Sequence, residues 1–233
     1  MTPKARQVIE EADVIIGYKT YVELINSLIK SSSEVIVGLM RQEVERARIA
    51  VGKALANKKV AVISSGDPGV YGMASIVFEV AALEKADIPI EVVPGVTAAT
   101  AAAAKLGAPL TSDFAVISLS DLLTPWELIE KRLDAAAAAD FVIVLYNPRS
   151  NERTEPLIKA YDILCKYRSP ETPVGVVKNL GRAGETATIT TLKMLLESAV
   201  DMATTVIVGN SLTRVVNQKM ITPRGYNLHK FSL

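Results

Sequence analysis

Three loops of the sequence carry residue types that bind ligands, and each follows a short apolar run. They are Ser65-Gly-Asp-Pro-Gly69 after Val60–Ser64, Pro94-Gly-Val-Thr-Ala-Ala99 after Ile90–Val93, and Asn147-Pro-Arg-Ser150 after Phe141–Tyr146. In open parallel sheets, ligands collect outside the carboxyl ends of the strands. We therefore expect the chemistry of this protein at these three loops.

The polar residues of these loops have two interpretations each. Asp67 is placed to pair with a cation or with ribose hydroxyls, but an aspartate in such a turn also closes an Asx turn or caps the next helix. Thr97 precedes a run of alanines and is expected to cap a helix there. Asn147-Pro148 is equally compatible with a plain strand-to-helix turn. Spacing alone leaves binding and structural roles open.

The glycine spacing argues against the common phosphate-binding loops. Gly66, Gly69 and Gly72 do not match the dinucleotide fingerprint, and Gly52-Lys53 lacks the rest of a P-loop. The glycines suit a flat or neutral ligand group better than a pyrophosphate. A nucleotide-dependent oxidoreductase on a doubly wound fold is the rival enzyme class, and the missing fingerprint disfavours it.

The composition excludes several other classes. The single histidine, His229, stands four residues from the end and is expected in a tail; the single cysteine, Cys165, is expected in the core. Neither a catalytic triad nor a metal-centred site is predicted. A formal charge of +1, with 26 basic and 25 acidic residues, disfavours nucleic-acid binding.

Neither a membrane nor an export pathway is indicated by the sequence. No apolar run reaches the roughly 18 residues that would span a bilayer. The first residues are polar, unlike a secretory signal, so we expect a cytoplasmic protein without membrane partners.

Five cations stand near predicted strand ends or in glycine-rich loops: Lys19, Arg149, Arg153, Lys178 and Arg182. Most such charges are simply solvated. If they gather on one rim, however, they suit a substrate with several carboxylates, through charge-assisted contacts.

β-Branched runs alternate with longer helical patterns along the whole chain, which predicts an α/β fold with mostly parallel sheets. The strands expected are 13–17, 34–38, 60–64, 90–93, 115–119, 141–146, 174–177 and 204–208, and helices are expected at 74–86, 98–105 and 125–139. Gly107 and Pro109 interrupt the pattern. We predict two α/β domains, 1–112 and 113–233.

Several of these stretches resemble a known family. Ser65-Gly-Asp-Pro-Gly-Val-Tyr-Gly-Met73 and Val93-Pro-Gly-Val-Thr-Ala-Ala99 resemble the signature loops of the tetrapyrrole methylases, the S-adenosylmethionine-dependent enzymes of the cobalamin and sirohaem pathways. Three further stretches resemble the family members that methylate C17 of a precorrin-3-type ring: Ser118–Trp126, Leu145–Ser150 and Lys178–Glu185. The resemblance covers essentially the whole chain.

The resemblance implies two α/β domains with a cofactor cleft between them, a homodimer, and an anionic tetrapyrrole substrate, with or without cobalt. Its implied contacts with S-adenosylmethionine are Ser65, Gly66, Asp67, Val70, Thr97, Ala98 and Asn147. Arg149, Lys178 and Arg182 are the candidates for binding substrate carboxylates, and no metal ligand is expected.

The implied reaction is methyl transfer to C17 with ring contraction, in cobalamin biosynthesis. The sulfonium supplies the driving force, so the protein mainly has to hold the reacting atoms about 3–3.5 Å apart and in line. Contraction also needs a proton to move, and Tyr18, Lys19 or a substrate carboxylate are the candidates. The sirohaem relatives carry Asp where Tyr18 stands, and a stacked or half-buried tyrosine is an equal alternative for that residue.

One departure from the family pattern bears on function. The family opens with a strand and a Gly-x-Gly-Pro-Gly loop before a Thr-Pro-x-Ala segment, whereas this sequence begins at Met1-Thr2-Pro3-Lys4-Ala5. A truncation or a mis-assigned start would explain the difference. The alternatives to C17 methylation are therefore methylation at C4 or C11, or a truncated paralogue that binds the tetrapyrrole or the cofactor without turnover.

Overall fold

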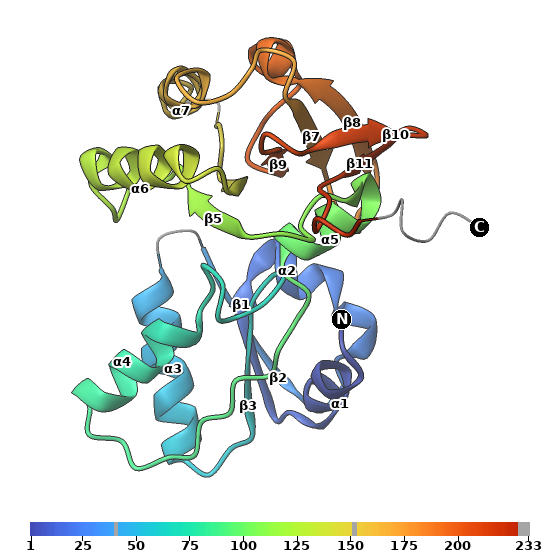
Figure 1. The fold of residues 1–233 in the computed structure, drawn as a ribbon. Coiled ribbons are helices and arrows are strands. Elements are labelled where there is room, and N and C mark those ends of the chain that lie inside the picture. The colour runs from blue at the N-terminus through green and yellow to red at the C-terminus, as the bar shows by residue number, and fades with distance from the viewer. Residues whose placement is uncertain (40–41, 151–152, 228–233) are drawn as a thin grey trace. The chain divides into compact units, whose positions relative to one another are not determined.

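The computed structural model describes residues 1–39, 42–150 and 153–227. It divides into two compact units, Met1–Thr97 and Ala98–Leu233, which Figure 1 shows as the blue-to-green and the green-to-red parts of the chain. Each unit combines helices with a sheet, so the α/β class is confirmed.

The first unit is a parallel three-stranded sheet with helices on both faces. In chain order its elements are α1 (Pro3–Glu11), β1 (Val14–Tyr18), α2 (Lys19–Leu24), the 3-10 helix η1 (Asn26–Leu28), β2 (Glu34–Gly38), α3 (Glu43–Leu55), β3 (Val60–Ile63) and α4 (Ala74–Leu83). The strand order is β2-β1-β3, and both pairings are parallel.

The central strand β1 explains how this sheet is covered. Ile15 points to one face and packs with Ile9 of α1. Val14 and Ile16 point to the other face and pack with Ala50 of α3. Alternate residues of a strand face opposite sides, so a continuous apolar run buries both faces of the sheet.

The strand expected at residues 90–93 does not form. These residues are assigned to no strand, and no described segment pairs with them. Their β-branched side chains favour an extended backbone, but a strand needs a neighbour to accept and donate its ladder hydrogen bonds. The other predicted strands form within one or two residues of the expected ends.

The second unit contains a larger sheet and a small one. Its elements are α5 (Ala98–Leu106), β4 (Gly107–Ala108), β5 (Phe114–Ser118), α6 (Trp126–Ala138), β6 (Val142–Tyr146), α7 (Glu155–Cys165), β7 (Pro173–Lys178), β8 (Thr186–Thr191), the 3-10 helix η2 (Leu192–Glu197), β9 (Thr204–Val208), β10 (Arg214–Val216) and β11 (Lys219–Ile221). The larger sheet has the order β5-β6-β9-β7-β8, and the small one has the order β10-β11-β4.

The larger sheet is mixed rather than mostly parallel. Only β5 and β6 pair in parallel, whereas β6 with β9, β9 with β7, and β7 with β8 are antiparallel. Strand β9 enters between β6 and β7 with reversed direction, so β5, β6 and β7 still run the same way. Their carboxyl ends, at Ser118, Tyr146 and Lys178, therefore share one edge of the sheet.

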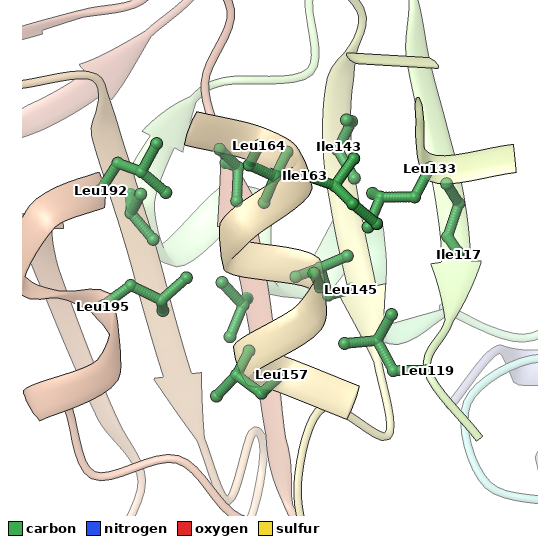
Figure 2. Packing of buried hydrophobic residues seen from close by; sticks show 14 of the residues in the cluster. Ile117, Leu119, Leu133, Ile143, Leu145, Leu157, Ile163, Leu164, Leu192 and Leu195 are labelled. Atoms are coloured by element: carbon green, nitrogen blue, oxygen red, sulfur yellow. The ribbon is translucent and has the colours of Figure 1, made fainter. Parts of the chain in front are cut away.

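Helices cover both faces of this larger sheet. On one face the side chains of α6, α7 and η2 pack onto the strands; Figure 2 shows part of this cluster, including Ile117, Leu119, Leu133, Ile143, Leu145, Leu157, Ile163, Leu164, Leu192 and Leu195. On the other face, Ala99, Ala102 and Leu106 of α5 pack against strand residues such as Val144 and Ile207.

Helix α5 also explains where the units divide. The sequence placed a domain boundary between residues 112 and 113, but the compact units divide between Thr97 and Ala98. Since the apolar face of α5 is part of the core of the second unit, α5 and β4 belong with that unit. A second difference concerns Cys165, expected in the core but exposed at the last residue of α7.

Gly175 in β7 provides a test of this packing. A Cβ added there would lie 2.2 Å from Cδ1 of Leu106, so Gly175→Ala must displace this buried side chain of α5. We expect a loss of about 1–3 kcal/mol in unfolding free energy, as for overpacked cores. Gly52 of α3, where a Cβ would meet nothing within 4 Å, is the matched control. Gly52→Ala should stabilise the protein by about 0.5–1 kcal/mol, as in other helix interiors. Urea denaturation measures both, and an equally stable Gly175→Ala variant would contradict the packing described.

Candidate active site

Asp67 joins two of the three predicted loops. Its Oδ1 accepts a hydrogen bond from the Gly69 amide at 2.8 Å, which closes the turn after β3. Its Oδ2 accepts from the Gly95 amide at 2.9 Å, across 28 positions in the chain. The structural and the site interpretations of Asp67 are thus compatible, because one carboxylate closes its own turn and also holds the second loop against it.

The backbones of these two loops pack directly on each other. A Cβ at residue 95 would lie 1.9 Å from the carbonyl oxygen of Gly66, so only glycine fits there. Gly66 itself has a φ of 70°, in the left-handed region that glycine adopts freely. The glycine at position 95 therefore accommodates the protein's own backbone.

Ser65 and Val70 flank the Asp67 turn. Ser65 is exposed two residues after the end of β3, and the Val70 amide donates to the Asp67 carbonyl at 3.2 Å. Tyr71 follows with a φ of 51°, an unusual conformation for a tyrosine, and its side chain is exposed. The turn is a rigid structure that presents Ser65 and Tyr71 to solvent.

Thr97 and Ala98 lie where the sequence predicted a helix to begin, since α5 starts at Ala98. Within the second unit, the Ala99 amide donates to Oη of Tyr146 at 2.6 Å. A tyrosine hydroxyl from the end of β6 thus satisfies one of the free N–H groups of the first turn of α5. Nothing in the sequence pattern pointed to Tyr146, because it contacts a segment 47 positions away.

The proton-transfer candidates differ in their surroundings. Tyr18 ends β1 and is half-buried, with its ring edge-on to that of Tyr21 at a centroid distance of 5.4 Å. Lys19 begins α2, and its Nζ lies 4.0 Å from Oε1 of Glu23. Of the two surroundings considered for Tyr18, the half-buried one is present, with an edge-on ring contact in place of a stacked one.

The third loop lies at the shared edge of the larger sheet in the second unit. Asn147 adopts a left-handed φ of 50° directly after β6, and its Nδ2 donates to Oγ of Ser118 at 3.0 Å. Ser118 and Tyr146 face each other in the β5–β6 register. Asn147 thereby ties together the residues that follow two neighbouring strands.

Arg153 holds the backbone around Asn147 in place. One Nη donates to the Leu119 carbonyl and to Oδ1 of Asp121, both at 3.2 Å, and the other donates to the Asn147 carbonyl at 3.4 Å. A guanidinium with three such partners is a structural clamp, and its charge is largely used within the protein.

The cations proposed to bind substrate carboxylates differ in the partners of their side chains. Nζ of Lys178 lies 2.6 Å from Oδ2 of Asp201, so its charge is paired. Arg149 is half-buried, and none of the residues that the structure describes makes a hydrogen bond or an ion pair with its side chain. Over the described residues, Arg149 is thus the cation of the five with the fewest such partners, and it stays the candidate for binding a substrate carboxylate.

Asp201 and Glu185 balance positive charge at this edge. Burial acts to raise the pKa of Asp201, but hydrogen bonds from Lys178, Thr204 and the Ala203 amide outweigh it and hold the pKa below its ordinary value. The hydrogen bond from Lys105, with a second from the Gly181 amide, lowers the pKa of Glu185. The lowered pKa values mean that both carboxylates stay negatively charged beside their lysine partners.

Glu185 also shapes the loop that carries Arg182. The Gly181 amide donates to Oε2 of Glu185 at 2.6 Å, and Nδ2 of Asn179 donates to the Gly184 carbonyl at 3.3 Å. These bonds fix the 179–185 connection between β7 and β8. Arg182 is half-buried within it and has interactions of its own.

The remaining observations concern metals and membranes. In the part of the chain that the structure describes, no group of three or more His, Cys, Asp or Glu side chains is arranged to hold a metal ion. Over the same residues, every helix is too short or too polar for a membrane span. His229 lies outside the described residues.

Comparison with known proteins places the chain in a family. A sequence model of the tetrapyrrole (corrin/porphyrin) methylases matches residues 1–196. A "cobalt-factor III methyltransferase" of Priestia megaterium is 52% identical over the whole chain, which spans 44% of that longer protein. A "probable cobalt-factor III C(17)-methyltransferase" of Salmonella typhimurium is 49% identical over 98% of this chain and 94% of its own length.

A solved structure agrees with these sequence matches. The methyltransferase CobJ has 37% sequence identity and a TM-score of 0.89, over 96% of this chain and 93% of its own. Two loops joined by Asp67 and a fold shared over nearly the full length lead to one conclusion: this chain belongs to the tetrapyrrole methylases.

Proposed function

We propose that this protein transfers the methyl group of S-adenosylmethionine to C17 of a cobalt-containing precorrin-3-type ring, with ring contraction, in cobalamin biosynthesis. The observation that carries the proposal is the 49% identity to the Salmonella typhimurium C(17)-methyltransferase along almost the whole of both chains. Both relatives described above have cobalt-factor III in their names, which favours the cobalt-containing substrate over the metal-free one.

The cofactor is assigned to the paired loops of the first unit. Asp67 uses one lone pair of each carboxylate oxygen for Gly69 and Gly95, so further lone pairs remain for hydroxyl donors such as those of a ribose. Ser65, Gly66, Val70 and Thr97 belong to the same two loops. Ala98 and Asn147, which belong to the second unit, are assigned to the cofactor by the family resemblance and stay predictions.

Bound S-adenosylmethionine supplies an activated methyl group on a sulfonium, so the protein needs no nucleophile of its own. Held by these loops, the cofactor would supply the methyl carbon for the new C–C bond and would leave as S-adenosylhomocysteine. What the chain has to provide is position, and the hydrogen-bonded loops around Asp67 are built for that. Tyr18 and Lys19 stay the candidates for moving the proton that ring contraction requires.

The proposal also includes the oligomeric state, the location and the binding partners of the protein. We expect a homodimer in the cytoplasm that binds an anionic tetrapyrrole and neither nucleic acid nor a membrane. Arg149 is expected to receive a substrate carboxylate, with Lys178 and Arg182 contributing charge to the same edge of the second sheet.

The reaction can be measured directly. Purified protein with S-adenosylmethionine should methylate cobalt-factor III at C17 and give a ring-contracted product, with a clearly lower kcat/KM for metal-free precorrin-3B. Mass spectrometry and NMR of the product identify the methylated carbon. A product methylated at C4 or C11 would contradict the proposal and assign a sister activity, and binding without turnover would indicate a non-catalytic paralogue.

Asp67→Ala tests the cofactor site. Removing the carboxylate leaves the Gly69 and Gly95 amides without their acceptor and separates the two loops. Loss of such hydrogen bonds costs about 1–3 kcal/mol, so we expect S-adenosylhomocysteine to bind at least about tenfold more weakly in calorimetry. Asp87→Ala, an exposed aspartate of the same unit, is the matched control and should bind like the parent. Unchanged affinity in Asp67→Ala would remove Asp67 from the site.

Arg149→Ala tests the assignment of the substrate carboxylate. Loss of a charge-assisted hydrogen bond costs about 1.5–3 kcal/mol, so KM for the tetrapyrrole should rise about tenfold or more while S-adenosylhomocysteine affinity stays the same. Arg132→Ala, an exposed arginine of α6, serves as the control for the lost charge. An equal KM in the two variants would show that Arg149 does not contact the substrate.

A further inference from the structure

Two leucines in the loop between β5 and α6 are exposed to an unusual degree. Leu122 is 66% and Leu123 is 99% exposed, whereas Leu119, in the same loop, is 0% exposed. Burying a leucine side chain stabilises a protein substantially. The same short segment therefore anchors one leucine in the core and presents the next two to solvent.

The base of this loop is held rigidly, so the exposure of its tip is not a result of loose attachment. The Leu119 amide donates to the Tyr146 carbonyl at 2.9 Å, and the Leu119 carbonyl accepts from Arg153 at 3.2 Å. The Ser120 amide donates to Oγ of Ser118 at 3.2 Å, and Asp121 pairs with the same arginine. The residues just before Leu122 are therefore held in place by hydrogen bonds.

The far end of the loop is anchored as well. Pro125 precedes the first residue of α6, Trp126, and this tryptophan packs partly buried against the main core of the second unit. The chain leaves the core after Leu119 and returns at Trp126. Leu122 and Leu123 form the tip of an arch between two fixed points, which we call the leucine tip.

The leucine tip follows the carboxyl end of β5, at the edge of the sheet where the candidate substrate cations lie. Asn147, two residues before Arg149, bonds to Ser118 at the foot of the arch. Arg149 is the half-buried guanidinium with no ion pair among the described residues. One short stretch of this edge therefore offers an apolar pair and a positive charge.

We propose that the leucine tip contacts the apolar face of the tetrapyrrole ring while Arg149 holds one of its carboxylates. This proposal rests on the proposed function. A tetrapyrrole combines a broad, flat, apolar ring with acidic side chains at its rim, and the edge of the second sheet offers matching groups for both. Leu122 and Leu123 are then residues that set affinity for a large flat ring and take no part in the chemical step.

A second copy of the chain is the other occupant to consider. A stable interface buries about 800 Å² of surface per partner, with about 20–30 residues a side. Two leucines on an arch supply a small part of such an area, and polar residues Ser120, Asp121 and Thr124 flank them. The size of the leucine tip fits a small molecule better than a protein partner.

The test replaces both leucines with serine. Leu122→Ser combined with Leu123→Ser should raise KM for cobalt-factor III about tenfold or more, in line with the loss of apolar contacts in a binding pocket. Its kcat, its affinity for S-adenosylhomocysteine and its melting temperature should stay close to those of the parent. The double change to methionine, which keeps an apolar surface, should restore most of the affinity.

Leu212→Ser provides the matched control. Leu212 is 58% exposed in the same unit, but it follows β9, whose direction is reversed, and so lies at the opposite edge of the sheet. It should leave KM unchanged. A double serine variant with the parent's KM, or one with an altered oligomeric state in light scattering and an unaltered KM, would overturn the inference. In either case the proposed function stands as long as the parent enzyme is active. A parent that methylates no precorrin-3-type ring would overturn both the proposed function and this inference.

Discussion

The two loops of the candidate site in the first unit are held together by one carboxylate, which accepts hydrogen bonds from two backbone amides. Asp67 holds its own turn through Gly69 and the second loop through Gly95. Each bond to a charged acceptor is stronger than a neutral one, and together they make one surface from segments far apart in the sequence. The contact of Gly95 with the Gly66 carbonyl completes this arrangement, because any larger residue would separate the loops. A cofactor that must be held in line for transfer requires a surface of this rigidity.

The second unit shows that a cation's place in the sequence does not reveal its use. Lys178, Arg149 and Arg153 all stand near strand ends. Lys178 forms an ion pair with Asp201, and Arg153 donates to three backbone and side-chain acceptors. Arg149 has no ion pair among the described residues. Two of these differences depend on distant residues that no local pattern identifies, since Asp201 is 23 positions from Lys178 and Leu119 is 34 positions from Arg153.

The sequence likewise predicts the parts of the fold that depend on local composition, and misses those that depend on residues far along the chain. Apolar β-branched runs such as 13–17 and 141–146 predicted strands correctly, because burial on both faces requires that composition. Residues 90–93 have the same composition and form no strand, since pairing depends on a neighbour and not on the segment itself. The reversed direction of β9 was likewise invisible, as its burial pattern is that of a parallel core strand. Of the candidate site, the sequence located the loops and Asp67, but neither the Gly95 contact nor Tyr146.

The proton that the proposed ring contraction requires has two candidate donors in this chain, Tyr18 and Lys19, whose side chains are held in different ways. A general acid must lie within about 2.6–3.2 Å of the atom it protonates, which requires a side chain held in a defined place. Tyr18 is carried by the central strand β1, opposite Gly38 of β2, and its ring rests against Tyr21. The Lys19 side chain is 67% exposed, and among the described residues its ion pair is with Glu23, at the limiting distance for such a pair. Because strand pairing fixes the backbone of Tyr18 while solvent leaves Lys19 free to rotate, we infer that Tyr18 is the better placed of the two for a step that tolerates little variation in distance.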